Sequence, residues 1–168
     1  MIRNNYTTRT TTQDPYDVDE KKGRVKLQQD YESSPYVWDC TFTTDKFDRL
    51  DCFSTAYTPN KNITYANEIK NRDILIDSYA KDGFIMEKIK YEALMEAYTQ
   101  SGYTPLYINY FTDGRIVWDV TTLQNVQDRW EWKWCTETTA DNYRKKMVLK
   151  EVILLYPQEG KVRRKINA

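Results

Sequence analysis

Residues 47–72 read FDRLDCFSTAY, then TPNKN, then ITYANEIKNR, and the interpretation of the whole chain starts from this stretch. Two segments rich in aromatic and β-branched residues flank a short polar run with proline and asparagine, which is the pattern of a β-hairpin. Glu68 and Lys70 are two residues apart, so in a strand both side chains point to one face, while Ile69 points to the other. The sequence therefore predicts a charged pair on one face of the hairpin and a core contact on the opposite face.

The position of the turn determines which residues of the two strands face each other. A turn centred on residues 59–62 places Asp51 opposite Lys70, and residue 53 opposite Glu68. Since directly opposed Cβ atoms lie about 4.5–5.5 Å apart, this register gathers Asp51, Glu68 and Lys70 on one face. A register shifted by one residue would move Asp51 to the other face and separate the three side chains.

Length and composition limit the classes of protein that fit. The 168 residues suit one domain, and we expect a flexible polar arm over residues 1–19 and a single domain over residues 20–168. No apolar run approaches the roughly 18–20 residues of a membrane span, which predicts a cytoplasmic protein without a membrane partner. Three cysteines with no close pairing suit a reducing compartment. The net charge of zero counts against nucleic-acid binding unless positive charge is concentrated on one face.

The sequence contains no histidine, which restricts the chemistry further. Ser-His-Asp and Cys-His nucleophilic sites are excluded, as are zinc sites ligated by histidine. Catalysis would have to combine Asp, Glu, Lys, Tyr or Cys with a hard cation such as Mg²⁺ or Mn²⁺, which prefers oxygen ligands. The carboxylates of Asp51 and Glu68 and the backbone carbonyl of Ile69 offer such oxygens. Lys70 can orient or deprotonate a water molecule, or stabilise negative charge on a phosphate.

The other elements are predicted from hydrophobic periodicity and turn signals. Helices are expected over residues 20–33 and 89–101, and strands over residues 36–43, 83–88, 106–111, 115–120, 130–134 and 145–156. Trp130, Trp132 and Trp134 share one strand face, which we interpret as a cover over the core rather than a platform for stacking bases. The order of elements predicts an α+β or α/β fold with a mixed central sheet.

Asp51, followed by Glu68-Ile69-Lys70 at the end of the next strand, resembles the PD-(D/E)XK nuclease superfamily, whose members have a restriction-endonuclease-like fold. The segments FDRLD, EIKNRD, MEKIKYEAL and GYTPLYINYFTDG extend the resemblance over residues 47–120. The resemblance implies an αβββαβ core whose mixed central sheet is flanked by helices. It also implies that Asp51 and Glu68 bind the metal ion and that Lys70 assists the attacking water.

The chain departs from the superfamily pattern around the first acidic residue. Leu50 stands where many members have proline, and Asp48 competes with Asp51 for the same role. The predicted register favours Asp51, because it shares the face of Glu68.

The resemblance also implies a first-helix acid and two phosphate-contacting residues, which spacing does not decide. Many members add an acidic residue from the first helix, and Glu20, Asp30 and Glu32 are all candidates here, of which we name Glu32. Lys90, at the start of the later helix, could contact a phosphate, and so could Arg72, although solvated side chains are the commoner case for such residues.

The resemblance implies a small phage-type nuclease that hydrolyses DNA by metal-dependent water attack, with endonuclease action favoured over exonuclease action. A homodimer would supply two active sites for cutting both strands. A catalytically inactive DNA-binding or phage assembly protein of the same fold is the main alternative. A β-rich module whose Trp and Tyr faces bind a protein partner is a third hypothesis.

Overall fold

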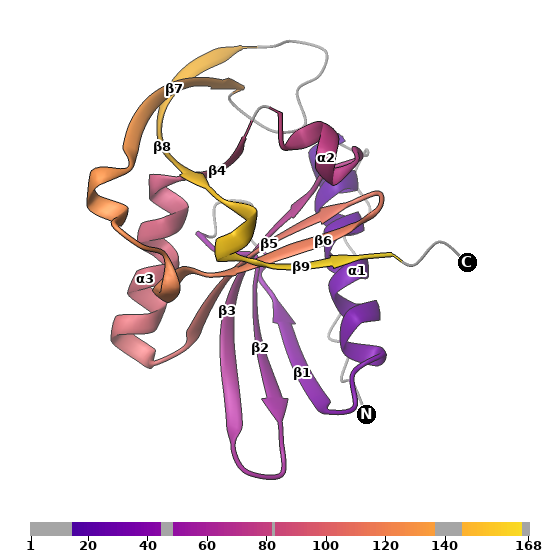
Figure 1. The fold of residues 1–168 in the computed structure, drawn as a ribbon. Coiled ribbons are helices and arrows are strands. Elements are labelled where there is room, and N and C mark those ends of the chain that lie inside the picture. Colours follow the sequence, from indigo (N-terminus) through magenta and orange to yellow (C-terminus); the bar gives the residue numbers. More distant parts are fainter. Residues whose placement is uncertain (1–14, 45–48, 82, 137–145, 166–168) are drawn as a thin grey trace.

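The computed structural model describes residues 15–44, 49–81, 83–136 and 146–165, and shows a six-stranded sheet flanked by helices, with a three-stranded sheet beside it (Figure 1). The helices are α1 (Pro15–Glu32), α2 (Ile76–Tyr79) and α3 (Lys88–Ser101). The strands are β1 (Val37–Phe42), β2 (Cys52–Tyr57), β3 (Asn62–Asn71), β4 (Phe84–Glu87), β5 (Thr104–Phe111), β6 (Gly114–Asp119), β7 (Trp130–Thr136), β8 (Met147–Leu155) and β9 (Lys161–Arg164).

The large sheet has the strand order β1-β2-β3-β5-β6-β9. Strand β3 pairs in parallel with β5, whereas the neighbouring pairs β1–β2, β2–β3, β5–β6 and β6–β9 are antiparallel. The parallel pair requires a crossover connection, and α3 lies within it. The mixed central sheet flanked by helices is therefore confirmed, and α1, β1, β2, β3, α3 and β5 follow the expected αβββαβ order.

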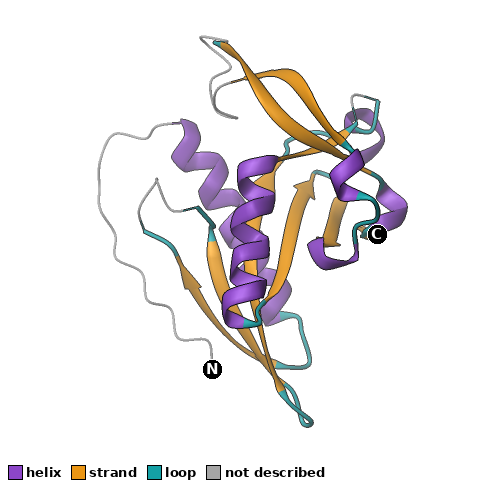
Figure 2. Cartoon of the chain, turned by 90° about the vertical axis from the view of Figure 1, so that its left-hand side faces the viewer, coloured by secondary structure: helices purple, strands orange, loops and turns teal. Residues whose placement is uncertain are grey.

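Helices lie on both faces of the large sheet (Figure 2). Strand alternation divides the hydrophobic residues between two cores on these opposite faces. Leu27 and Tyr31 of α1 pack against Ile69 and Ile108 on one face. On the other face, the larger cluster includes Leu94 of α3 among many residues of β3–β6 and β8. Because α1 covers one face of the large sheet and α3 covers the other, the central strand β3 is buried along most of its second half.

The helix that we predicted over residues 20–33 is confirmed but begins earlier, at Pro15. The arm expected over residues 1–19 therefore overlaps the first turn of α1, and residues 1–14 lie outside the described part of the chain. Proline suits a helix start, because its missing N–H would have no partner there and its fixed φ angle is helical. Among the described residues, no helix combines the length and apolar character needed to cross a membrane.

The hairpin between β2 and β3 is confirmed, but the predicted register is wrong by two residues. Phe53 pairs with Ala66, not with Glu68. Thr58 is the reason, because its N–H and its hydroxyl both bind the carbonyl of Lys61 and close the turn one residue earlier than expected. A shift of two residues keeps the alternation of faces, so Glu68 and Lys70 still share one face.

The interpretation of the tryptophan face is wrong for two of its three residues. Trp130 packs against the large core, but 65% of Trp132 and 64% of Trp134 is exposed. Strand β4 pairs only with the last part of β8, from Val152 to Leu155, so the rest of the β7–β8 ribbon extends beyond the body (Figure 1). No element of the described chain covers that half of the ribbon, and its indoles remain in contact with solvent.

Candidate active site

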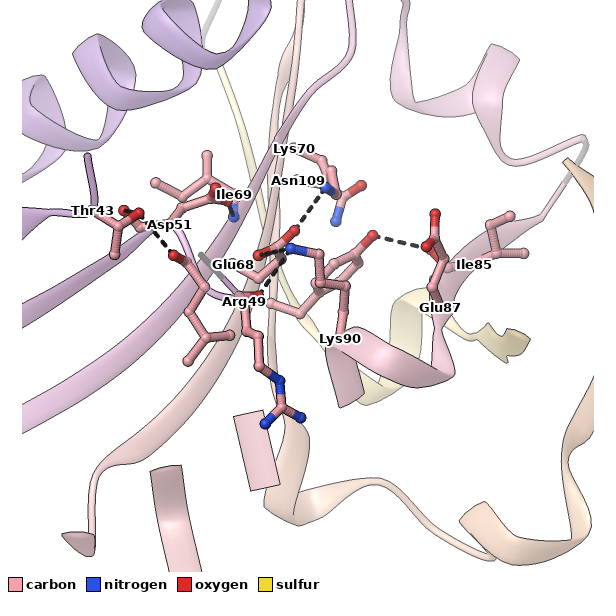
Figure 3. A network of polar contacts seen from close by, with 12 residues as sticks. Thr43, Arg49, Asp51, Glu68, Ile69, Lys70, Ile85, Glu87, Lys90 and Asn109 are labelled. Carbon is pink, nitrogen blue, oxygen red and sulfur yellow. Dashed lines mark hydrogen bonds and ion pairs between the residues drawn. The ribbon is translucent and has the colours of Figure 1, made fainter. Parts of the chain in front are cut away.

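Glu68 is the most unusual residue of the large core, because its carboxylate is completely buried. Strand β3 brings it to the face that α3 covers, and two lysines approach it there (Figure 3). Nζ of Lys70, on the same strand, lies 2.7 Å from Oε1, and Nζ of Lys90, in the first turn of α3, lies 3.1 Å from Oε2. A buried carboxylate needs compensating charge, and the two ammonium groups supply it.

Asp51 is fixed at the point where β2 begins. Its Oδ2 accepts a hydrogen bond of 2.6 Å from the backbone N–H of Ile69, and its own N–H donates to the carbonyl of Asn67 at 3.0 Å. Thr43 holds the Asp51 carbonyl through its N–H and its hydroxyl. The carboxylate of Asp51 is thereby held beside the backbone that separates Glu68 from Lys70. Asp48, the competing acid, lies outside the described residues.

The charges in this cluster shift one another's protonation equilibria. Burial raises the pKa of Glu68, and Asp51 adds to this effect, while Lys70 and Lys90 act in the opposite direction. Burial, the largest single effect, would lower the pKa of Lys70, but Glu68, Tyr107 and Asp51 together outweigh it, so the pKa of Lys70 is raised. Lys70 is therefore a cation beside Glu68, and it is better suited to donating hydrogen bonds than to accepting a proton.

The three candidate acids of the first helix are placed very differently. Glu32 is exposed and is the last residue of α1, before the chain enters β1. Asp30 is occupied by an ion pair with Arg115 and by the hydroxyl of Tyr110, which donates to it at 2.6 Å. The structure brings neither of them to Glu68.

Glu20 is the first-helix acid whose contacts lead to the cluster. It forms an ion pair with Arg24, whose Nη2 also donates to the carbonyl of Thr43 at 2.9 Å. Thr43 in turn holds Asp51, so a chain of polar contacts connects Glu20 with Asp51. Sequence spacing alone had left Glu20, Asp30 and Glu32 as alternatives, because it does not show where β1 and β2 end relative to α1.

Two further residues of the site come from β5 and were missed by the sequence interpretation. Strand pairing places Tyr107 beside Glu68, and Asn109 beside Lys70. The Tyr107 hydroxyl donates to the carbonyl of Ile85 at 3.1 Å, and Oδ1 of Asn109 accepts a long bond of 3.5 Å from Nε of Arg72. The available signal was a single asparagine inside the apolar run LYINYF, which indicates a polar position in a core strand.

An open groove of about 440 Å³ lies next to this cluster, between β2 and α3. Its lining includes Thr43, Leu50 and Phe53 from the hairpin side and Ala97 and Tyr103 from the side of α3. Leu50 directly precedes Asp51, so the groove borders the cluster. It is not lined by the four charged residues of the cluster, which are Asp51, Glu68, Lys70 and Lys90.

The donor set fits a hard divalent cation. Among the described residues, no group of three or more His, Cys, Asp or Glu side chains is arranged to hold a metal ion, so the protein offers two carboxylates and backbone oxygens. Mg²⁺ is commonly held by one or two carboxylates, with water and substrate phosphates completing its shell. Oε1 of Glu68 is buried and has the Lys70 ammonium group 2.7 Å away as its partner, so a metal ion bound there would share this oxygen with Lys70.

The chain matches no protein-family model, and no curated protein sequence matches it. Among solved structures, it is similar to Hjc, a Holliday junction resolvase from the archaeal hyperthermophile Archaeoglobus fulgidus, with a TM-score of 0.46 and 12% sequence identity. The alignment covers 80% of this chain and 83% of Hjc. At this level of similarity, the roles of individual residues have to be inferred from the contacts of this chain's own side chains.

Proposed function

We propose that this protein is a metal-dependent nuclease that hydrolyses phosphodiester bonds of DNA by water attack. One observation carries the proposal: a fully buried glutamate, Glu68, lies between two lysines and next to a second, rigidly held carboxylate, Asp51. Such a cluster is costly to bury, because each charge loses its hydration. Perturbed charged groups of this kind are concentrated at functional sites.

Asp51 and Glu68, with the backbone carbonyl of Ile69, are the proposed ligands for Mg²⁺ or Mn²⁺. When bound, the ion would lower the pKa of a water molecule and neutralise charge that develops on the phosphate. The hydrogen bond from Ile69 N–H fixes the Asp51 carboxylate in place, so this ligand is pre-positioned. Lys70, charged and close to Glu68, would orient the attacking water and stabilise the negative charge of the phosphate.

Lys90 has a role of its own in this proposal. Its ammonium group contacts Oε2 of Glu68 and the carbonyl of Arg49, which lies 2.9 Å away. It therefore acts as a built-in counter-cation among oxygen atoms that a metal ion would also attract. Glu20 supports the opposite side of the site through Arg24 and Thr43, and we propose it, in place of Glu32, as the first-helix acid.

The finer points of the proposal concern the substrate and the assembly. DNA is the proposed substrate, with endonuclease action favoured over exonuclease action, in the cytoplasm of a bacterial host if the protein is encoded by a phage. A homodimer would present two such sites to the two strands of a duplex.

Cleavage assays test the proposal directly. The full chain is incubated with linear, circular, single-stranded and four-way-junction DNA in Mg²⁺, Mn²⁺ or EDTA, and compared with the Lys70→Ala variant. Lys61→Ala is the matched control, because Lys61 is exposed at the tip of the same hairpin. We expect cleavage that needs the metal, is lost in Lys70→Ala and persists in Lys61→Ala. Intact DNA under every metal condition would contradict the proposal.

A catalytically inactive DNA-binding or assembly protein is the second candidate function. It is favoured by the fact that both carboxylate oxygens of Glu68 already have a lysine partner. The two lysines balance the charges of Glu68 and Asp51, so the cluster is neutral without a metal ion. DNA binding that persists in Lys70→Ala, together with the absence of cleavage products, would support this alternative.

A further inference from the structure

Asn109 occupies a position in the large core that an aliphatic side chain would fill at lower cost. It lies in β5 between Lys70 of β3 and Ile116 of β6, and only 2% of it is exposed. Tyr107 and Phe111, two residues to either side on the same strand face, belong to the apolar cluster. An amide loses its hydration in such surroundings, and the loss is offset only where both of its polar atoms are bonded.

Only half of the Asn109 amide is bonded. Oδ1 accepts the long bond from Nε of Arg72, whereas Nδ2 has no hydrogen-bond partner in the described chain. Figure 3 shows the amide next to the side chain of Lys70. The interior of the protein therefore holds a donor without a partner in the described chain next to the proposed active site, and such a group in a core strand calls for an explanation, such as a functional role or an ordered water molecule.

Arg72 is the hydrogen-bond partner of Asn109 and lies nearer the surface. It is half-buried, its guanidinium carbon lies 4.8 Å above the ring of Tyr79, and it has no acidic partner among the described residues. Asn109 and Tyr79 thus fix the orientation of a guanidinium whose terminal N–H groups are not engaged by a carboxylate. A planar guanidinium held in this way matches the oxygen atoms of a phosphate.

We infer that Asn109, Arg72 and Lys70 form a subsite for a backbone phosphate of a nucleic acid, next to the phosphate that is processed at Glu68. Asn109 positions Arg72 through Oδ1, and the partly exposed side chains of Arg72 and Lys70 supply the donors that reach the phosphate. An aspartate at this position would pair with Arg72 and cancel its charge, whereas the neutral amide leaves the positive charge available. The nucleic-acid ligand rests on the proposed nuclease function, but the set of convergent donors is independent of turnover.

Binding in EDTA, without turnover, tests the subsite. Fluorescence anisotropy with a labelled duplex and a labelled four-way junction is measured over a series of salt concentrations. Arg72→Ala should weaken binding and reduce the slope of log K against log salt by about 0.9, the value for one phosphate contact on duplex DNA. Asn109→Leu should weaken binding about tenfold, the effect of one lost hydrogen bond to a charged group. Lys61→Ala, at the far tip of the hairpin, should leave both quantities nearly unchanged.

Thermal unfolding separates this role from a structural one. Asn109→Leu replaces an incompletely bonded amide with an aliphatic group of similar size, so its melting temperature should equal or exceed that of the wild type while affinity falls. Asn109→Asp should weaken binding more than Asn109→Leu, because it also neutralises Arg72. Should Asn109→Leu fail to fold, the salt slope of Arg72→Ala still decides the question.

The outcomes distinguish the subsite from the nuclease proposal. Wild-type affinity in both Asn109 variants, with a wild-type salt slope in Arg72→Ala, would overturn the subsite even if the protein cleaves DNA. Weakened binding in these variants would support the subsite even if the wild type never cleaves, in which case only the nuclease proposal fails. A wild-type protein with no affinity for any nucleic acid would overturn both.

Discussion

The ammonium group of Lys90 lies 3.1 Å from Oε2 of Glu68, although Glu68 belongs to a central strand and Lys90 to the helix that crosses over it. The same group also donates to the carbonyl of Arg49 at 2.9 Å. The chain thus supplies a cation of its own at the place where it also gathers carboxylate oxygens. Charge balance at Glu68 therefore connects the stability of the fold with the proposed binding of a metal ion.

We predict that Lys90→Gln strengthens metal binding and weakens the metal-free fold. Removing the built-in cation leaves Glu68 with Lys70 alone, so a divalent ion no longer competes with an ammonium group at Oε2. Isothermal titration with Mn²⁺ should show tighter binding than in the wild type. In EDTA, the free energy of unfolding should fall by about 1.5–3 kcal/mol, the usual effect of losing a hydrogen bond to a charged group. Lys81→Gln, an exposed lysine before β4, is the control, and weaker Mn²⁺ binding in Lys90→Gln would contradict the competition.

Asp51 allows its charge and its hydrogen bond to be tested separately. Asp51→Asn retains an oxygen acceptor for the Ile69 N–H, whereas Asp51→Ala loses both the acceptor and the charge. Both variants should lose cleavage by about a hundredfold or more, because a metal ligand contributes several kcal/mol of transition-state stabilisation. Only Asp51→Ala should also lose about 1 kcal/mol in the free energy of unfolding. Cleavage at the wild-type rate in Asp51→Asn would remove Asp51 from the proposed site.

The first-helix acids should differ in their effect on cleavage. Glu20→Gln disturbs the contacts through Arg24 and Thr43 to Asp51, and we expect cleavage to fall about tenfold, as for other residues that orient a metal ligand. Glu32→Gln is the matched control at the far end of the helix, and it should cleave like the wild type. The reverse order of these two rates would show that the contact chain from Glu20 has no functional meaning.

The ion pair between Arg129 and Glu159 should make stability depend on pH in the acid range. The two side chains are 14% and 15% exposed, and the hydrogen bond from Arg129 lowers the pKa of Glu159 despite an opposing effect of burial. Because the folded-state pKa lies below the unfolded value of about 4.3, the stabilisation is fully present above that pH. It is lost as the pH falls through the folded-state pKa.

Unfolding measured at neutral and acid pH tests whether this ion pair stabilises the fold less as the pH falls. At pH 7, Glu159→Gln should unfold with a free energy about 1.5–3 kcal/mol lower than that of the wild type. The difference should shrink as the pH is lowered, while Asp128→Asn, an exposed neighbour, should change little at either pH. A difference between wild type and Glu159→Gln that grows in acid would contradict the assigned direction.

The tryptophans provide a direct check on the two ends of the β7–β8 ribbon. Trp132 and Trp134 are mostly exposed, whereas Trp118 is completely buried and donates its indole N–H to the carbonyl of Tyr156 at 2.9 Å. The double change Trp132→Ser and Trp134→Ser should alter the free energy of unfolding little, but it should remove most of the fluorescence that iodide quenches. Trp118→Ala should cost about 3–5 kcal/mol. Strong iodide quenching that survives the double change would place these indoles elsewhere.

Local sequence patterns were sufficient to predict the elements that carry the candidate site. Alternation around Glu68, Ile69 and Lys70 predicted a strand with a charged face, and helical periodicity over residues 89–101 predicted α3. Both patterns act over a few residues, so they can be interpreted without knowing the neighbours in space. The absence of histidine also restricts the chemistry independently of the tertiary structure.

The site itself depended on contacts between distant parts of the chain. The turn closed by Thr58 determined the hairpin register, and the parallel pairing of β3 with β5 placed Asn109 beside Lys70. The crossover helix brought Lys90 to Glu68, and the end of β4 left Trp134 exposed. Local periodicity determined which side chains share a face of a strand or helix. Which faces meet was decided only by the tertiary structure, because strand pairing and core packing connect residues that are remote in sequence.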